Sequence, residues 1–382
     1  MNARRHLFIP ALCLLPTLAG CVAAADPAPP PQARVAVPGP AAVPVAEPVR
    51  VAEPAPPPVA PVPAGPNTAA LDANIDAIGR AFPGDVGIAI TSVSDGWTVD
   101  YDGNSLFPQQ SVSKLWVAVT ALDQVRSGKL RLQTPVTLSS ADLVVFNQPL
   151  AARLRGGPFT TTVEDLIDRA MTQSDNLAND KLLWTVGGPA VVRDTLRRLG
   201  VTDVRFGPGE RLLQAQTAGV TWRDSLAGGR AFEAERARLP LSVRQDALNR
   251  YLKDPIDGAA PAGITRGLAK LKKGDLLGQD LGEYLLRIMG RTRTGPQRLK
   301  AGTPPGWLFS HKTGTGQVLG SLATGYNDVA LVTAPDGRSY AVAVMIGATR
   351  AGIPERQAFM QEVMRALGRW KTSEDFRTRF GG

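Results

Sequence analysis

Short, mainly hydrophobic runs bounded by polar and turn residues lie near both ends of the chain, which is the pattern expected of strands. Two such runs, residues 86–93 and 97–101, are separated by the turn residues Ser94-Asp95-Gly96 and predict a hairpin. Three more strand-like runs lie close to the end of the chain, at residues 307–311, 329–334 and 340–346. The predicted strands therefore come from two regions that are far apart in the sequence.

Several other segments of the chain have hydrophobic residues at helical spacing. Residues 68–82 have one hydrophobic face and predict a helix before the first strand, and residues 354–370 predict a helix that closes the domain. Residues 113–125 are apolar on nearly every side, which is typical of a buried helix. Residues 243–251 predict a further helix within the long region between the two groups of strands.

Strands at both ends with helices between them predict an α+β fold. We expect one antiparallel sheet built from both chain ends and flanked by helices, with an all-helical subdomain inserted into it. Residues 67–106 and 291–371 would form the α/β part, and residues 107–290 the helical part. Together, residues 67–371 are enough for one domain with a sizeable core, and residues 372–382 are expected to be a tail.

The first twenty residues have the layout of a signal peptide. Arg4 and Arg5 precede an apolar stretch at residues 7–18, which is too short to span a membrane. The stretch ends in Leu18-Ala19-Gly20-Cys21, which resembles the lipobox of bacterial lipoproteins. The resemblance implies cleavage after residue 20, a lipid on Cys21, and an exported protein anchored at the periplasmic face of a membrane. An ordinary signal peptide followed by an incidental cysteine is the alternative.

Residues 21–66 follow as a segment rich in proline and alanine, with 15 prolines. Such a segment lacks the N–H groups needed for helix or sheet and favours extended polyproline conformations. We interpret it as a tether, and a spacer of no particular length is the alternative. Because the only other cysteine, Cys13, lies in the expected signal peptide, the mature chain has no pair that can form a disulfide.

Charge and histidine content exclude several classes of function. The formal net charge is +9, but the charges are scattered and the one short basic run is Lys270–Lys273, so we expect no binding to nucleic acid. His6 lies in the signal peptide, which leaves His311 as the single histidine of the mature chain. We therefore expect no metal site, and we interpret His311 as a packed strand residue.

Ser111-Val112-Ser113-Lys114 is the first sequence with candidate chemistry. The serine and the lysine lie three residues apart at the start of the predicted buried helix, so both side chains face the same way. The positive end of a helix favours negative charge on the serine oxygen. A lysine in apolar surroundings loses its proton more easily and can act as a base. This spacing alone is common in chains of this length.

Two further triplets make coincidence an untenable explanation. Ser174-Asp175-Asn176 follows a segment with helical spacing, and Lys312-Thr313-Gly314 follows the strand-like run at 307–311. The three motifs in this order resemble those of the penicillin-recognising serine enzymes, and specifically of class A β-lactamases. The resemblance covers nearly all of the globular part. It includes Phe107-Pro108, Gly187-Gly188-Pro189 and Phe146, which stands where the family usually has an aromatic residue at the rim of the cleft.

The resemblance implies roles for the reacting groups. Ser111 would be the nucleophile that is acylated, and Lys114 its partner in proton transfer. Ser174 would relay a proton to the departing ring nitrogen, and Asn176 would contact the amide side chain of the substrate. No cofactor is implied.

The resemblance also implies how the substrate is held. Lys312 and Thr313, in the motif that Gly314 completes, would meet the substrate carboxylate. The backbone N–H groups of Ser111 and Thr315 would form the oxyanion hole. The implied partners are a small β-lactam and, through the lipid on the N-terminal cysteine, a membrane, and we expect a monomer.

Glu210 distinguishes hydrolysis from the other reactions of this scaffold. Class A enzymes have a glutamate between the second and third motifs that activates water, and Glu210 lies 36 residues after Ser174, in register with it. The surroundings depart from the family pattern, because Gln214 replaces the asparagine that helps to hold this water and Pro208 replaces an arginine. The interpretation as the deacylating base therefore stands beside that of an ordinary solvated loop acid.

Two insertions border the expected cleft. The segment between Gln214 and Asp257 is longer than is typical of the family by roughly 34 residues, far more than an ordinary connection, and about five extra residues lie within Gln317–Tyr326. The second insertion contains no arginine, although the family usually has one there that binds the substrate carboxylate. Arg356 and Arg350 are the candidates to replace it.

Three functions remain open at this point. The leading one is β-lactam hydrolysis through a serine ester. The second is a peptidoglycan D-Ala-D-Ala peptidase, or another serine hydrolase, on the same scaffold. The third, of a different class, is a non-catalytic lipoprotein that senses β-lactams or binds the cell wall.

Overall fold

The computed structural model describes residues 67–380. The expected signal peptide, the expected lipidation site at Cys21 and the expected tether lie outside the described residues. Within residues 67–380, no helix combines the length and the apolar character needed to cross a bilayer.

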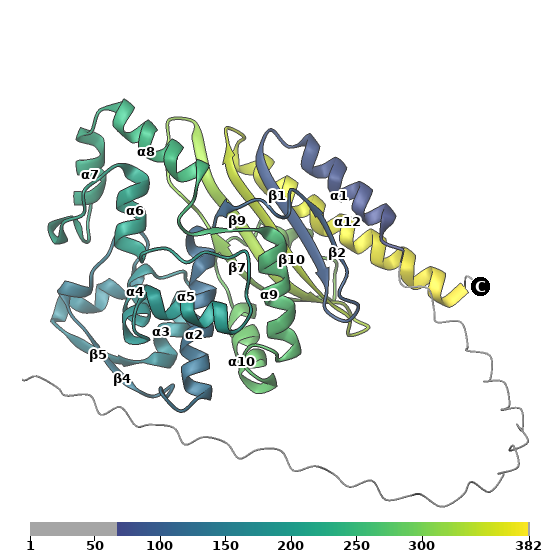
Figure 1. Cartoon of the computed structure of the whole chain (residues 1–382), viewed down its shortest axis with the longest axis horizontal. Coiled ribbons are helices and arrows are strands. Elements are labelled where there is room, and N and C mark those ends of the chain that lie inside the picture. The colour runs from purple at the N-terminus through teal and green to yellow at the C-terminus, as the bar shows by residue number, and fades with distance from the viewer. Residues whose placement is uncertain (1–66, 381–382) are drawn as a thin grey trace, which may run out of the picture. The chain divides into compact units, whose positions relative to one another are not determined.

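An antiparallel sheet forms the centre of one part of the molecule, and its strands come from both ends of the chain (Figure 1). The strand order is β2-β1-β10-β9-β7, and the short β8 pairs with β9. The strands are β1 (Gly84–Ser92), β2 (Thr98–Tyr101), β7 (Leu308–Gly314), β8 (Val318–Leu319), β9 (Leu322–Thr333) and β10 (Ser339–Thr349). Strand β1 pairs with β10 directly, with Ile90 opposite Val342, so the first and last strands of the sequence lie side by side.

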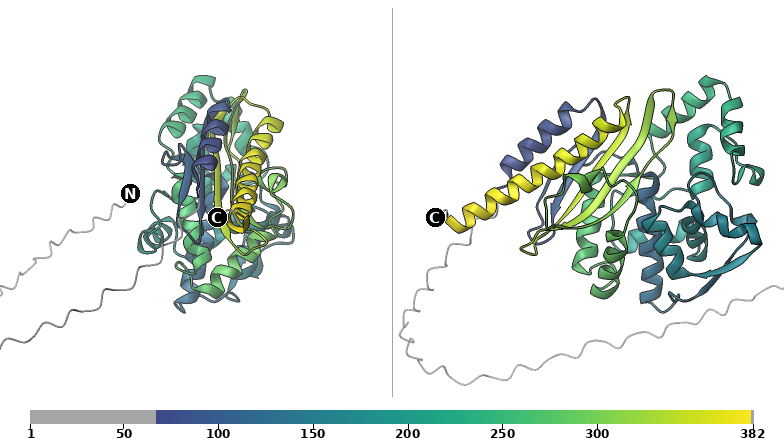
Figure 2. Two further views of the ribbon diagram at one scale, coloured as in Figure 1. Left: turned by 90° about the vertical axis from the view of Figure 1, so that its right-hand side faces the viewer. Right: turned by 180° about the vertical axis from the view of Figure 1, so that it is seen from behind.

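Two helices cover one face of this sheet (Figure 2). They are α1 (Ala69–Ala81) and α12 (Ile353–Phe380), which pack against each other and against the sheet. Their buried side chains, among them Leu71, Ile75 and Met364, form one core with the apolar residues on that face of the strands. Helix α9 (Pro261–Lys273) packs on β1, β9 and β10 from the helical part.

The helical part surrounds α2 (Lys114–Arg126), whose residues from Lys114 to Asp123 are all buried. This explains the nearly uniform apolar character of the sequence there. The surrounding helices are α3 (Val163–Thr172), α4 (Asn176–Thr185), α5 (Pro189–Arg198) and α10 (Gln279–Gly290). Short strand pairs complete this part: β3 (Phe107–Pro108) with β6 (Gly258–Ala259), and β4 (Pro135–Leu138) with β5 (Phe159–Thr162).

The long insertion forms a small helical layer at the edge of the helical part (Figure 1). It contains α7 (Ala231–Arg238) and α8 (Leu241–Lys253), and it follows α6 (Glu210–Ala218). The predicted helix at residues 243–251 is confirmed as part of α8. Two small apolar clusters anchor the layer: one joins Phe232 to Val145, and the other joins Leu248 to Leu319 on β8.

The predicted α+β class and the antiparallel sheet from both chain ends are confirmed. Three boundaries differ from the expectation. Helix α12 continues to Phe380, so residues 372–380 are helical where a tail was expected. Strand β9 begins at Leu322, before the strand-like run at 329–334, and Lys312–Gly314 belong to β7 instead of following it. Strands β7 and β9 extend beyond their strictly apolar stretches because the backbone pairing of β9 with β7 on one side and with β10 on the other continues past them.

Candidate active site

Ser111 and Lys114 lie together at the entrance of α2. A 3₁₀ turn at Gln110–Ser113 leads into the helix and places the lysine Nζ 2.6 Å from the serine Oγ. Lys114 Nζ also donates to Asn176 Oδ1 at 2.8 Å. The lysine is only 1% exposed, and burial lowers the pKa of its amine, an effect that the nearby Glu210 carboxylate partly opposes. An amine that loses its proton readily, in hydrogen-bond contact with a hydroxyl, can take the hydroxyl proton.

Ser174 and Lys312 form a second serine–lysine pair on the other side of the site. Lys312 Nζ donates to Ser174 Oγ at 3.0 Å and to the backbone oxygen of Thr313 at 2.8 Å. The lysine is buried, and burial together with the positive charges of Lys114 and Arg298 holds its pKa well below the usual range. Ser174 has a φ of 55°, a conformation rare outside glycine, which turns its side chain toward the strand that carries Lys312.

Asp175, the middle residue of the second motif, is structural in this arrangement. Its carboxylate accepts from the backbone N–H of Ala178 at 2.9 Å and so caps the start of α4. The other carboxylate oxygen accepts from the backbone N–H of Leu150 at 2.6 Å. These two bonds hold the segment in which Ser174 and Asn176, the residues before and after Asp175, line the cavity.

Glu210, at the first position of α6, faces the same site. Its side chain is 10% exposed, so it is not a solvated loop acid. Oε1 accepts from Asn176 Nδ2 at 2.9 Å and from Gln214 Nε2 at 3.1 Å, and Oε2 lies 4.0 Å from Lys114 Nζ. Burial raises the pKa of Glu210, while the neighbouring Lys114 lowers it. A carboxylate held by two amides and raised in basicity is suited to accept a proton from water.

Glutamine side chains extend the network from Glu210 to the inserted segments. Gln214 Nε2 also donates to Gln110 Oε1 at 3.1 Å, and Gln214 Oε1 accepts from Gln317 Nε2 at 2.9 Å. Gln214 therefore joins the residue before the nucleophile to the insertion that follows Thr315. The extra methylene that distinguishes it from asparagine gives it this reach.

Asp257 and Tyr251 support the loop that carries the nucleophile, a role that the sequence analysis did not assign to them. Gln110, which precedes the nucleophile, has a φ of 52°, and its backbone N–H donates to Asp257 Oδ2 at 2.8 Å. Tyr251, on the inserted helix α8, donates from its hydroxyl to Asp257 Oδ1 at 2.9 Å. Burial raises the pKa of Asp257 to about 6. The Tyr251 hydroxyl and the Gln110 backbone N–H thus hold this carboxylate. Pro208, which stands where the family has an arginine, has no charge with which to pair with it.

Arg298 is a second residue that the sequence analysis missed. It donates to the backbone oxygens of Gly314 and Asn327 at 2.8 and 2.6 Å and to Thr315 Oγ1 at 2.6 Å. Its guanidinium lies 3.7 Å from the centre of the Tyr326 ring. The cation therefore stands beside the end of β7. Only the fold shows this, because nothing in the sequence separates Arg298 from the neighbouring Arg291 and Arg293.

The candidates Arg350 and Arg356 are wrong for this place. Arg350 donates to Ser321 Oγ at 3.2 Å, and Arg356 donates to the backbone oxygen of Ala351 at 2.8 Å. Neither lines the cavity in front of Ser111. The arginines that line it are Arg236 and Arg298.

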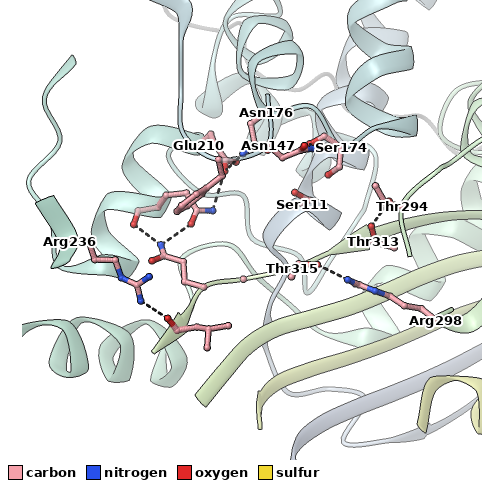
Figure 3. A pocket seen from close by; sticks show the side chains of 15 residues that line it. Ser111, Asn147, Ser174, Asn176, Glu210, Arg236, Thr294, Arg298, Thr313 and Thr315 are labelled. Atoms are coloured by element: carbon pink, nitrogen blue, oxygen red, sulfur yellow. Dashed lines mark hydrogen bonds between the residues drawn. The ribbon is translucent and has the colours of Figure 1, made fainter. Parts of the chain in front are cut away.

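A cavity of about 490 Å³ opens in front of these groups (Figure 3). Two lysines, Lys114 and Lys312, lie buried beneath it, and Gly314 allows the close approach of β7 to the backbone of Gln109. The predicted site residues that line the cavity are Ser111, Phe146, Ser174, Asn176, Glu210, Gln214, Thr313 and Thr315. The other lining residues are Asn147, Arg236, Thr294, Arg298, Gly316, Gln317 and Val318.

Comparison with known proteins places this site in a family. The model of the β-lactamase enzyme family matches residues 70–370. The chain belongs to the β-lactamase enzyme family. The expectation from the three motifs, a serine β-lactamase of class A, is confirmed at this level.

Individual relatives of this β-lactamase are distant but cover most of it. The extended-spectrum β-lactamase PER-1 of Pseudomonas aeruginosa is 26% identical over 281 residues, which are 73% of this chain and 80% of the relative. The crystal structure of a β-lactamase from Chitinophaga pinensis has 25% identity and a TM-score of 0.65, covering 79% of this chain and 99% of that one. An ancestral class A β-lactamase has 27% identity and a TM-score of 0.63, covering 78% and 99%.

In residues 67–380 no three histidine, cysteine or acidic side chains are grouped closely enough to hold a metal ion. His311 is buried in β7, where its Nδ1 lies 2.9 Å from Asp328 Oδ1, in keeping with the interpretation as a packed strand residue. It does not line the cavity.

Proposed function

We propose that this enzyme opens β-lactam rings through an ester on Ser111 and releases the product with water activated by Glu210. The observation that carries the proposal is the pair of contacts around one buried lysine. Lys114 Nζ lies 2.6 Å from Ser111 Oγ and 4.0 Å from Glu210 Oε2, so the candidate nucleophile and the candidate base for water share one cavity.

Acylation begins with transfer of the Ser111 proton to the unprotonated amine of Lys114. The serine oxygen then forms a bond to the carbonyl carbon of the ring, and the backbone N–H groups of Ser111 and Thr315 stabilise the negative oxygen. The bond between the carbonyl carbon and the ring nitrogen breaks. The nitrogen takes the proton that Lys114 received from Ser111, relayed through the hydroxyl of Ser174, which is hydrogen-bonded to Lys312 Nζ at 3.0 Å.

The substrate carboxylate is assigned to the end of the cavity beside β7. Thr313 and Thr315 present their hydroxyls there, Arg298 supplies positive charge, and an anion would favour the protonated form of the buried Lys312. An anionic group is favoured at such a place because it offsets the repulsion between Arg298 and the protonated lysine. Asn176 and Gln214, which line the cavity, are assigned to the substrate's amide side chain and to the attacking water.

Deacylation returns the enzyme to its starting state. A water molecule held between Glu210 and the ester gives one proton to the carboxylate as its oxygen attacks the carbonyl carbon. The bond to Ser111 Oγ breaks, and the serine oxygen takes up the proton that Glu210 accepted from the water, relayed through Lys114, so that all three groups regain their starting protonation. The raised pKa of Glu210, caused by burial, makes its carboxylate a stronger base for this step.

Steady-state kinetics with a penicillin, a chromogenic cephalosporin and a D-Ala-D-Ala peptide, combined with intact mass spectrometry, test this proposal. Rapid turnover of the two β-lactams with no lasting adduct supports hydrolysis. A long-lived penicilloyl adduct with cleavage of the peptide would make the chain a peptidoglycan peptidase. An adduct with no turnover of any of the three would indicate a sensor. The absence of both adduct and turnover would overturn the proposal and favour a non-catalytic wall-binding protein.

The same proposal includes where the enzyme acts. We infer that residues 1–20 are removed, that Cys21 carries a lipid, and that residues 21–66 tether the catalytic domain, which begins at residue 67, at the periplasmic face of a membrane. The apolar stretch that ends at Cys21 and the proline-rich composition that follows it support this. The catalytic domain is expected to act as a monomer without a cofactor.

A further inference from the structure

The inserted layer reaches both rims of the cleft and brings a cation into it. Phe232 on α7 packs edge to face against Phe146, with ring centres 5.4 Å apart. One turn further along the same helix, Arg236 donates from Nη2 to the backbone oxygen of Val318 at 2.8 Å. Helix α7 therefore connects the aromatic rim to β8, and Arg236 lines the cavity between them.

Arg236 is a cation without an acidic partner. Among residues 67–380, no carboxylate lies within ion-pair distance of its guanidinium, and its one side-chain hydrogen bond goes to Val318. Two other arginines of the insertion, Arg223 and Arg238, both pair with Glu235. Arg236 is half-buried and its Nε has no partner; burial and the charge of Arg244 lower the pKa of its guanidinium, which the charge of Glu233 raises by less. A partly desolvated cation of this kind is stabilised when an anion binds to it.

The position of Arg236 relative to Arg298 indicates which part of a substrate it meets. In Figure 3, Arg236 and Arg298 lie at opposite ends of the cavity, with Thr315 between them and Ser111 near the middle. In a penicillin, the ring carboxylate and the acylamino side chain project from opposite ends of the fused rings. A substrate with its carboxylate beside Arg298 and its carbonyl at Ser111 therefore directs its side chain toward Phe146, Val318 and Arg236.

We propose that Arg236 binds an anionic group on the acylamino side chain and so selects β-lactams that carry a second carboxylate. This inference rests on the proposed function and goes beyond it, because it names a substrate class and a specificity-determining residue. A planar guanidinium forms two parallel hydrogen bonds with a carboxylate, and such a pair gains strength where water is partly excluded.

A matched pair of substrates isolates this contact. Carbenicillin differs from benzylpenicillin only by a carboxylate on the side-chain carbon next to the amide. We expect Arg236→Gln to lower kcat/KM for carbenicillin about tenfold, mainly through KM, while kcat/KM for benzylpenicillin stays within about twofold. Arg236→Lys, which keeps the charge, should retain most of the activity toward carbenicillin.

The control is Arg238→Gln on the same helix. Arg238 is 79% exposed and does not line the cavity, so this variant removes a charge from α7 without touching the cleft. It should leave both substrates unchanged. Thermal melting of all variants identifies any loss of the fold, and if Arg236→Gln does not fold, the comparison is made with Arg236→Lys and Arg236→Met.

The outcomes separate this inference from the proposed function. Equal losses for the two penicillins, or no change for either, overturn the role of Arg236 while leaving the hydrolase intact. If the wild type is acylated without turnover, the acylation rates of wild type and variant with carbenicillin and with benzylpenicillin are compared instead, measured by intact mass spectrometry. A wild type that reacts with neither penicillin overturns the proposed function, and the inference falls with it.

Discussion

Tyr251 donates a hydrogen bond to Asp257 across the base of the inserted layer, with the two oxygens 2.9 Å apart. The tyrosine belongs to the inserted helix α8, while the aspartate also accepts from the backbone N–H of Gln110, next to the nucleophile. The insertion is thus bonded to the loop that carries Ser111. It takes part in the architecture of the site, and removing it would leave a buried carboxylate with half of its partners.

The first prediction concerns the pH dependence of stability. Burial raises the pKa of Asp257 from 3.8 to about 6, so between these values the folded protein holds a proton that the unfolded chain has released. This group therefore stabilises the fold most at low pH, and its contribution falls by up to about 3 kcal/mol as the pH rises through that window. Asp257→Asn should remove the dependence.

Denaturant unfolding of wild type and Asp257→Asn at about pH 4.5 and about pH 7.5 measures this effect. The free energy of unfolding of the variant, relative to wild type, should increase between the two conditions. Asp254→Asn is the control, because Asp254 is exposed and pairs with Arg205 on the surface. A difference between variant and wild type that is the same at both pH values would show that Asp257 is ionised throughout.

Arg298 is predicted to determine affinity for the substrate carboxylate. Arg298→Gln removes the positive charge beside Thr315 and should raise KM for benzylpenicillin about tenfold, equivalent to about 1.4 kcal/mol, with a smaller effect on kcat. Arg350→Gln is the matched control, since Arg350 lies outside the cavity. An unchanged KM in Arg298→Gln would show that Lys312 and Thr313 bind the substrate carboxylate without help from Arg298.

Ser111→Ala should abolish covalent labelling by a fluorescent penicillin and all β-lactam hydrolysis. The reason is that Ser111 is the hydroxyl in hydrogen-bond contact with Lys114, and an alanine offers no oxygen to acylate. Ser113→Ala is the control, because the Ser113 hydroxyl donates to the backbone oxygen of Gln110 instead of facing the lysine. A label that persists in Ser111→Ala, located by peptide mass spectrometry, would identify a different nucleophile.

Cys21→Ser is predicted to release the enzyme from the membrane fraction. A lipidated cysteine is the anchor that the sequence offers, and stable attachment of such a protein needs its acyl chains. Fractionation of cells followed by immunoblotting measures the change, with Cys13→Ser as the control that should stay in the membrane pellet. Retention of the Cys21→Ser protein in the pellet after a salt wash would contradict the lipobox interpretation.

The residues that could be predicted from the sequence are those whose chemistry depends on short spacings. Ser111 and Lys114 are one helical turn apart and Lys312-Thr313-Gly314 ends a strand, and these short motifs, together with Ser174-Asp175-Asn176, carry the resemblance to class A β-lactamases from which their roles were inferred. Arg298 and Asp257 could not be predicted in this way. Their roles come from backbone oxygens and amides that reach them from distant parts of the chain, and a sequence carries no local signal for such contacts. Arg236 belongs to the same group, because only the packing of α7 brings it to the cleft.

The final prediction concerns Glu210, on which hydrolysis depends. Glu210→Gln keeps the shape of the side chain and leaves Ser111 and Lys114 in place, so benzylpenicillin should still acylate the enzyme. The neutral amide cannot accept a proton from water, and general-base assistance is typically worth about 10²- to 10⁴-fold in rate. The acyl-enzyme should therefore accumulate and appear in the intact mass as an increase equal to the mass of the drug, with a burst in stopped-flow absorbance. Glu233→Gln, on the exposed side of α7, is the matched control and should turn over normally. Full turnover in Glu210→Gln would show that another group activates the water, whereas a wild type that stalls in the same way would place the chain with the peptidoglycan peptidases or the sensors.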